Sequence, residues 1–232
     1  MNLPRPDDYI DIHTHGSQPE SGLFVVNTLM VHENDTFIPD PGVACCAGIH
    51  PWHLNPDNCE KLWNRLLELA GNPDLFAIGE AGFDRLRGPS PGLQREMFYR
   101  QALLAEKIRK PLVIHCVKAW EELLAGHSKI RPSVPWLVHG FRGSRELALQ
   151  LVSRNFYLSF WFDFIKRPAA TEILPVLPRE KIFLETDGSG TDITEIYRKV
   201  SADLSLSVEE LKTLVYNNFM AFAGQTSQSE PA

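Results

Sequence analysis

The amino-acid sequence predicts an α/β fold, a single (β/α)8 barrel of the TIM type. Short runs of apolar and β-branched residues recur along the chain, and each is followed by a helical or irregular stretch. These runs lack a regular alternation of polar and apolar residues, which is typical of parallel strands buried on both faces. The chain has 232 residues, and barrels of this type commonly contain about 250. Together these observations favour one barrel over two smaller domains.

Eight strands and six helices are expected. The strands cover residues 9–13, 23–29, 43–49, 75–79, 111–115, 135–139, 156–160 and 181–187. The clearest helices cover residues 92–109, with one continuous apolar face, and 207–223, where Ser207 and Glu210 form a capping box. Weaker helical patterns cover residues 57–70, 119–126, 144–154 and 169–177. Alternation of strands and helices indicates βα units.

The composition excludes several classes of protein. Charged residues at 22% and aromatic residues at 10% are ordinary values, which argues against a disordered or fibrous chain. No apolar run approaches the roughly 18 residues of a membrane span, and the N-terminus has no hydrophobic signal core. The four cysteines show no C-x-x-C spacing, as expected of reduced thiols in a cytoplasmic protein. We expect a barrel over residues 1–225, a disordered tail over 226–232, and a monomer or weak homo-oligomer.

The strongest chemical signal lies at the expected strand ends. His13 and His15 are two residues apart, so both side chains project from one face of the first strand. Four more groups that can bind metals end other strands: Glu80, His115, His139 and Asp187. In a (β/α)8 barrel these ends meet at one rim, where active sites lie. Such groups are costly to bury together without cations. A metal centre is therefore the leading hypothesis, and histidines hydrogen-bonded in a polar rim are the alternative.

Several motifs together resemble one protein family. The segments YIDIHTH, GIHPWH, GEAGFD, KPLVIHC, VHGFRGS and FLETD have the order and spacing of the TatD family of metal-dependent deoxyribonucleases, within the amidohydrolase superfamily. The resemblance implies a barrel that holds two divalent metal ions. It implies these ligands: His13, His15 and Asp187 for one ion, His115 and His139 for the second, and Glu80 as a bridge.

The expected residue types fit hydrolysis of a phosphodiester, with DNA or another phosphate-bearing molecule as the substrate. Two metals about 3.5–4 Å apart can activate a shared water and polarise a phosphoryl oxygen. Imidazole and carboxylate ligands suit zinc, manganese or cobalt, and four histidines suit magnesium less well. Glu80 and Asp187 are the expected catalytic carboxylates, and Asp187 could also accept the proton of the water.

Further residues are candidates for substrate binding. His50 and His53 follow the third strand, and the resemblance implies a phosphate contact for His50, whereas His53 could equally cap a turn. Lys118 and Arg142 belong to a set of cations that follow strand ends, with Arg85, Arg87, Arg145, Lys166 and Arg167. A positive rim on a chain of net charge −6 would attract an anionic substrate, although solvated loops tolerate any charge.

The remaining chemistry-bearing residues have less specific interpretations. Asp84 is expected to anchor a loop or orient a metal ligand. We expect His32 and His127 to be structural or solvated, and Cys116 to be packed in the core. Four aromatic residues could line a nucleobase site or belong to the core: Trp52, Trp120, Trp161 and Phe162.

The chain departs from the family pattern in the expected substrate loops. A short Gly188-Ser189-Gly190 segment and then helix-like sequence follow Asp187, Val117 replaces a family arginine, and Arg85 replaces an aromatic residue. None of these positions is an expected metal ligand. Alternative functions are an amidohydrolase or lactonase, a phosphatase of the polymerase-and-histidinol-phosphatase type, and a non-catalytic binding barrel. The phosphatase type usually has a histidine after the last strand, and this chain has none there. A non-catalytic binding barrel would not need all six ligands.

Overall fold

The computed structural model describes residues 2–32 and 42–224, so the expected tail at 226–232 lies outside the described residues. Eight parallel strands lie in chain order in one sheet. They are β1 (Tyr9–Thr14), β2 (Leu23–Met30), β3 (Ala44–Gly48), β4 (Leu75–Asp84), β5 (Leu112–Val117), β6 (Trp136–Val138), β7 (Phe156–Trp161) and β8 (Ile182–Glu185). The expected barrel and its eight strands are confirmed.

The main difference from the expected strands is in β4. We expected this strand to end at residue 79, but it continues to Asp84 because Ala81 to Asp84 pair with Ile114 to Val117 of β5. The register shifts between Ile78 and Ala81. Glu80 therefore lies within the strand rather than at its end.

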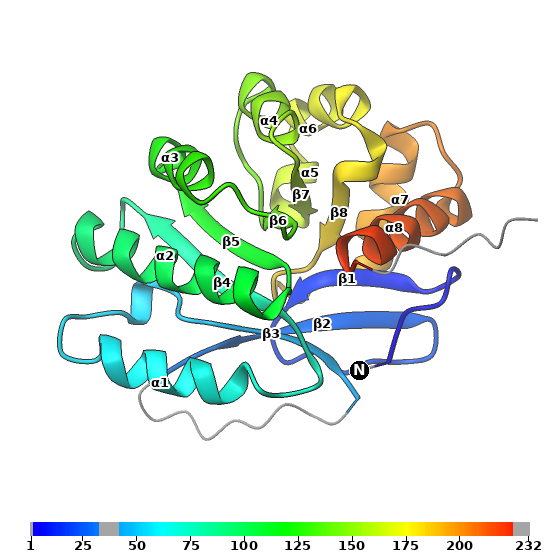
Figure 1. Ribbon diagram of the computed structural model, residues 1–232. Helices are drawn as coiled ribbons and strands as arrows, with labels where there is room; N and C mark the ends of the chain where they lie inside the picture. Colours follow the sequence, from blue (N-terminus) through cyan, green and yellow to red (C-terminus); the bar gives the residue numbers. More distant parts are fainter. Residues whose placement is uncertain (1, 33–41, 225–232) are drawn as a thin grey trace, which may run out of the picture.

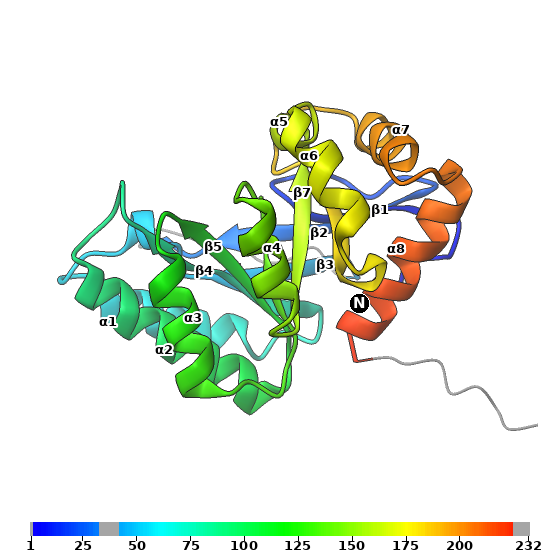
Figure 2. The ribbon, with the colours of Figure 1, turned by 90° about the horizontal axis from the view of Figure 1, so that it is seen from above.

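Helices lie around the outside of the strands (Figure 1). They are α1 (Cys59–Leu69), α2 (Pro91–Ile108), α3 (Trp120–Ile130), α4 (Arg145–Val152), α5 (Phe162–Ile165), α6 (Pro168–Ile173), α7 (Ile193–Asp203) and α8 (Val208–Phe222), with single 3-10 turns at Pro51–His53, Leu174–Val176 and Arg179–Lys181. Helices α1, α2 and α3 gather on one side and α7 and α8 on the other (Figure 2). The capping box at Ser207 and Glu210 is present. Among the described helices, none is long and apolar enough to cross a membrane.

Helix α8 covers the N-terminal ends of several strands. Phe219 stacks on Phe76 of β4, with ring centroids 4.9 Å apart, and lies 5.0 Å from Phe24 of β2. Phe222 lies 5.5 Å from Phe183 of β8 and 5.0 Å from Tyr157 of β7. Each of these four partners is the second residue of its strand. This aromatic cluster closes one end of the barrel and leaves the C-terminal ends of the strands for a site.

Hydrogen bonds between β1 and the residues that follow β8 complete the ring of strands. The carboxylate of Asp11 accepts hydrogen bonds from the backbone N–H of Thr186 at 3.1 Å and from its hydroxyl at 2.6 Å. The N–H of Asp187 donates to the carbonyl of His13 at 3.1 Å. Burial raises the pKa of Asp11 to about 7, and the hydrogen bonds from Thr186 oppose that shift. This seam fixes Asp187 beside the end of β1.

Candidate metal centre

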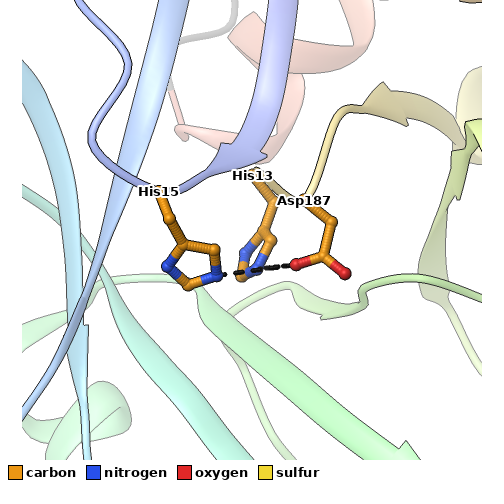
Figure 3. A group of neighbouring side chains, drawn as sticks. All are labelled: His13, His15 and Asp187. Atoms are coloured by element: carbon orange, nitrogen blue, oxygen red, sulfur yellow. Dashed lines mark ion pairs between the residues drawn. The ribbon is translucent and has the colours of Figure 1, made fainter. Parts of the chain in front are cut away.

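The six expected ligands converge at the C-terminal end of the barrel. His13 and His15 lie at the end of β1, and Asp187 lies two residues after the end of β8 (Figure 3). The Oδ1 atom of Asp187 lies 3.6 Å from Nε2 of His13 and 3.5 Å from Nε2 of His15. Three donor atoms from two strand ends therefore face one point.

Glu80 lies between two groups of imidazoles. Its Oε2 atom is 3.6 Å from Nε2 of His13 and 4.0 Å from Nε2 of His15. Its Oε1 atom is 2.6 Å from Nε2 of His139 and 3.0 Å from Nδ1 of His115. The side chain is 5% exposed, so it has almost no access to solvent. The two carboxylate oxygens therefore face different histidines, His13 and His15 on one side and His115 and His139 on the other.

Gly82 allows β4 to approach β5 beside this carboxylate. Its φ is +156°, and a Cβ atom built there would lie 1.9 Å from the carbonyl oxygen of His115. Any other residue would force the two strands apart. The close approach keeps His115 within reach of Glu80.

Carboxylates hold the far nitrogens of two of the histidines. Nε2 of His115 lies 3.2 Å from Oδ2 of Asp84, and Nδ1 of His139 lies 3.4 Å from Oε1 of Glu185. Ser159 donates a hydrogen bond to the other oxygen of Glu185. Each of these two rings therefore lies between carboxylates, with Glu80 on the inner side and Asp84 or Glu185 on the outer side. Outer carboxylates of this kind orient histidines that bind metals, where the ring proton lies on the outer nitrogen and the inner nitrogen is left for the ion.

His13 also has a polar partner at its outer nitrogen, but its inner nitrogen has none. Its Nδ1 atom is 3.0 Å from the hydroxyl of Thr28, and its Nε2 atom is buried without a hydrogen-bond partner. A buried polar atom without a partner costs about 1–3 kcal/mol. A cation between His13, Glu80 and Asp187 would satisfy it.

The carboxylates of the cluster are held in the charged form. Burial alone would raise the pKa of Glu80, but the charge of His139 and the surrounding imidazole hydrogen bonds hold it well below its ordinary value. Burial also raises the pKa of Asp187, whereas the imidazoles of His13 and His15 beside it lower it below its ordinary value. Both side chains are therefore anionic at neutral pH, as ligands of a cation must be.

His50 lies deeper than its expected place on the rim. It is 2% exposed, and its Nε2 atom is 3.2 Å from Oε1 of Glu80. Its Nδ1 atom accepts the backbone N–H of Trp52 at 3.1 Å, and burial lowers its pKa. A neutral imidazole that accepts at Nδ1 carries its proton on Nε2. His50 therefore presents an N–H to Oε1 of Glu80.

The other expected substrate residues surround the centre without joining it. His53 is half-buried against His32, with ring centroids 3.9 Å apart, and burial lowers its pKa to about 4. Arg142 lies over the ring of Trp161 at 4.0 Å. Lys118 is exposed, with a φ of +52°.

Two residues of the centre were not expected from the sequence. Glu185 and Thr28 each hold the outer nitrogen of a histidine. Glu185 lies two residues before Asp187, so the alternation of strand side chains was an available signal. No pattern pointed to Thr28. The loop-anchoring role expected for Asp84 is confirmed, because its Oδ1 atom accepts the N–H of Leu86 at 2.7 Å.

The donor atoms fit divalent metal ions. Carboxylate and imidazole groups gather in overlapping sets of three, such as His13 with His15 and Asp187, and His13 with Glu80 and His139. Facing atoms are 2.6 to 4.0 Å apart. Two ligands that each bind an ion at about 2.0–2.2 Å lie roughly 3–3.5 Å apart. The cluster is therefore of the metal-binding type.

Comparisons with known proteins point to one family. A sequence model of the family described as TatD related DNase matches residues 36–224. A protein from Citrobacter koseri named 3′-5′ ssDNA/RNA exonuclease TatD is 34% identical over 152 residues, which are 62% of this chain and 58% of that protein. Its namesake from Salmonella typhimurium is 33% identical over 146 residues, 61% of this chain and 56% of that protein. The chain thus matches less than two thirds of the length of these relatives.

Solved structures share the fold at low sequence identity. A TatD family hydrolase from Entamoeba histolytica superposes with a TM-score of 0.77 at 18% identity, over 95% of this chain and 99% of that one. A TatD homologue from Escherichia coli K12 has a TM-score of 0.76 at 19% identity, over 94% and 98% of the two chains. At this identity the likeness concerns the fold alone.

Proposed function

The chain belongs to the family of TatD-related DNases, and from this premise we propose that it is a metal-dependent nuclease. Its proposed reaction is hydrolysis of phosphodiester bonds in single-stranded DNA or RNA, from the 3′ end. Two kinds of finding support this: the names of the relatives and the chemistry of the centre. An anionic strand also suits a protein with cations around that centre.

The proposed ligand set follows the two groups of histidines. His13, His15 and Asp187 would hold one ion, and His115 and His139 the second, with Glu80 between the two. The observation that carries the proposal is the division of the Glu80 carboxylate, whose Oε2 faces His13 at 3.6 Å and whose Oε1 faces His139 at 2.6 Å. Four imidazoles favour zinc, manganese or cobalt over magnesium.

The residues have distinct proposed tasks in hydrolysis. Two divalent ions at such a centre supply an activated water and polarise the phosphoryl group. Asp187 is the proposed proton acceptor, because its side chain is 25% exposed and so remains reachable by water, unlike that of Glu80. The Nε2–H of His50 is a donor that can stabilise negative charge on a phosphoryl oxygen.

A product assay tests this function. The purified protein, supplied in turn with zinc, manganese, cobalt and magnesium, would be mixed with single-stranded DNA and RNA carrying a label at the 5′ end. We expect a ladder that shortens from the 3′ end and is abolished by a chelator and by Glu80→Gln. Cleavage of lactones or amides without cleavage of DNA, RNA or bis(p-nitrophenyl) phosphate would overturn the proposal in favour of an amidohydrolase.

A further inference from the structure

One carboxylate links the metal centre to the loop that follows β4. Oδ1 of Asp84 accepts the N–H groups of Leu86 at 2.7 Å and Arg87 at 3.0 Å. Its Oδ2 atom lies 2.7 Å from Nε1 of Trp52 and 3.2 Å from Nε2 of His115. Asp84 thus fixes an indole and a loop relative to a histidine of the centre.

The same loop is packed closely against the segment that carries Trp52. Gly88 has a φ of +101°, and a Cβ atom built there would lie 2.8 Å from the carbonyl oxygen of Pro51. From the other side, Nε2 of Gln94 donates to the carbonyls of Asp84 at 3.0 Å and Pro89 at 2.9 Å. Residues 85–90 are therefore held in place although most of them are exposed.

Arg87 is a cation without a counter-charge in this fixed loop. Its Cζ atom lies 4.0 Å from the ring centroid of Trp52, a side chain 40% exposed. Within residues 2–32 and 42–224 Arg87 forms no ion pair, whereas Arg85 lies 2.6 Å from Oε1 of Glu122. The ring of Trp52 is 5.6 Å from that of His115. An unneutralised guanidinium is thus stacked beside the metal centre.

We propose that Arg87, positioned by Trp52, binds a second phosphate of the nucleic-acid strand whose scissile phosphate lies at the metal centre. This inference rests on the proposed function. Stacking occupies the face of the guanidinium and leaves the N–H groups on its edge free to form paired hydrogen bonds with a phosphate. His53, whose pKa Arg87 affects, is held neutral instead, because burial first and then neighbouring charges lower its pKa to about 4.

A binding measurement tests Arg87 directly. The metal-loaded protein would be titrated into fluorescein-labelled (dT)6 with phosphorothioate linkages, which keep the negative charges and slow hydrolysis, and fluorescence anisotropy would be followed at several NaCl concentrations. We expect Arg87→Gln to weaken binding about 10-fold, as for loss of a charge-assisted hydrogen bond. The slope of log affinity against log salt should fall by about 0.7, the value for one phosphate contact on a single strand. The matched control Arg85→Gln should change neither quantity.

Kinetics add a second readout. With unmodified (dT)6, Arg87→Gln should raise KM about 10-fold with a smaller change in kcat, because a bound phosphate stabilises ground and transition states alike. Trp52→Leu should raise KM in the same direction, and adding it to Arg87→Gln should cost less than the sum of both effects.

The outcomes separate this proposal from the proposed function. An unchanged affinity and salt slope for Arg87→Gln, in a protein that hydrolyses bis(p-nitrophenyl) phosphate, would overturn the phosphate site and leave the nuclease intact. A reduced slope in a protein that hydrolyses no phosphodiester would support the phosphate site and overturn the nuclease. An equal loss in Arg85→Gln would show general electrostatic attraction and would also overturn the site.

Discussion

The Nδ1 atom of His139 lies 3.4 Å from Oε1 of Glu185, on the side of the ring turned away from Glu80. Glu185 is fully buried and also accepts a hydrogen bond from Ser159. With a metal bound, this contact would keep the ring proton on Nδ1 of His139 and leave Nε2 for the ion. Outer partners of this kind determine how well a histidine binds its metal.

Replacing the outer partner should therefore weaken metal binding. We expect Glu185→Ala to lower metal affinity about 10- to 100-fold, the usual effect of losing such a partner. Competition with a coloured chelator measures the affinity. Thr28→Val, which removes the hydroxyl beside Nδ1 of His13, should act in the same direction. Unchanged affinity in both variants would show that these contacts do not orient the ligands.

Asp187 has two proposed tasks that one substitution separates. Asp187→Asn keeps the shape and a neutral oxygen but removes the proton acceptor. We expect kcat to fall by about 10²–10⁴-fold, the span for a positioned general base, while metal content and thermal stability change little. Turnover and metal content would be measured on the same preparation. Near wild-type turnover with the metals in place would assign the base elsewhere.

The cations on the other side of the centre have a testable role in substrate binding. Arg142 stacks on Trp161 at 4.0 Å, and Lys118 is exposed. Substituting either residue with Gln should raise KM for an oligonucleotide with a smaller change in kcat. Arg167 is a suitable control, because it lies 2.7 Å from Oδ2 of Asp163, whereas Arg142 is 3.8 Å from the same oxygen. Identical kinetics in all three variants would class Arg142 and Lys118 as solvated surface charges.

The seam between β8 and β1 should contribute to stability. Thr186→Val removes the hydroxyl that donates to Asp11 at 2.6 Å and leaves a buried carboxylate oxygen with one partner fewer. We expect a loss of about 1–3 kcal/mol in the free energy of unfolding, measured by urea denaturation. Thr191→Val makes a control, because its hydroxyl forms no hydrogen bond within the described residues. Equal stabilities would mean that the seam is held by backbone contacts alone.

Much of the fold could be predicted because parallel strands buried on both faces have a continuous apolar pattern. The extension of β4 beyond residue 79 could not be predicted in this way. Gly79 and Gly82 flank Glu80, and glycine interrupts a strand pattern although it permits the close approach to β5. Only the pairing of Ala81 to Asp84 with β5 extends the strand.

The proposed ligands could be predicted because strand ends of a barrel meet at one rim. Their outer partners were harder to predict. Thr28 reaches His13 through the pairing of β1 with β2, whose register shifts between Asp11 and Thr14. Such a shift leaves no trace in one sequence. The depth of His50 depends likewise on the turn after β3, where its Nδ1 atom accepts the N–H of Trp52.

The metal content of the purified protein tests whether Glu80 and the surrounding histidines hold two ions. Elemental analysis would be carried out on wild-type protein and Glu80→Gln after dialysis against each candidate metal and removal of the free ions. We expect close to two divalent ions per wild-type chain. Glu80→Gln should hold fewer ions and should keep the circular dichroism spectrum of the wild type, because the proposed bridge needs a charged carboxylate and the barrel does not. A wild-type chain that binds no divalent ion, or a Glu80→Gln variant that binds as many ions as the wild type, would contradict the account.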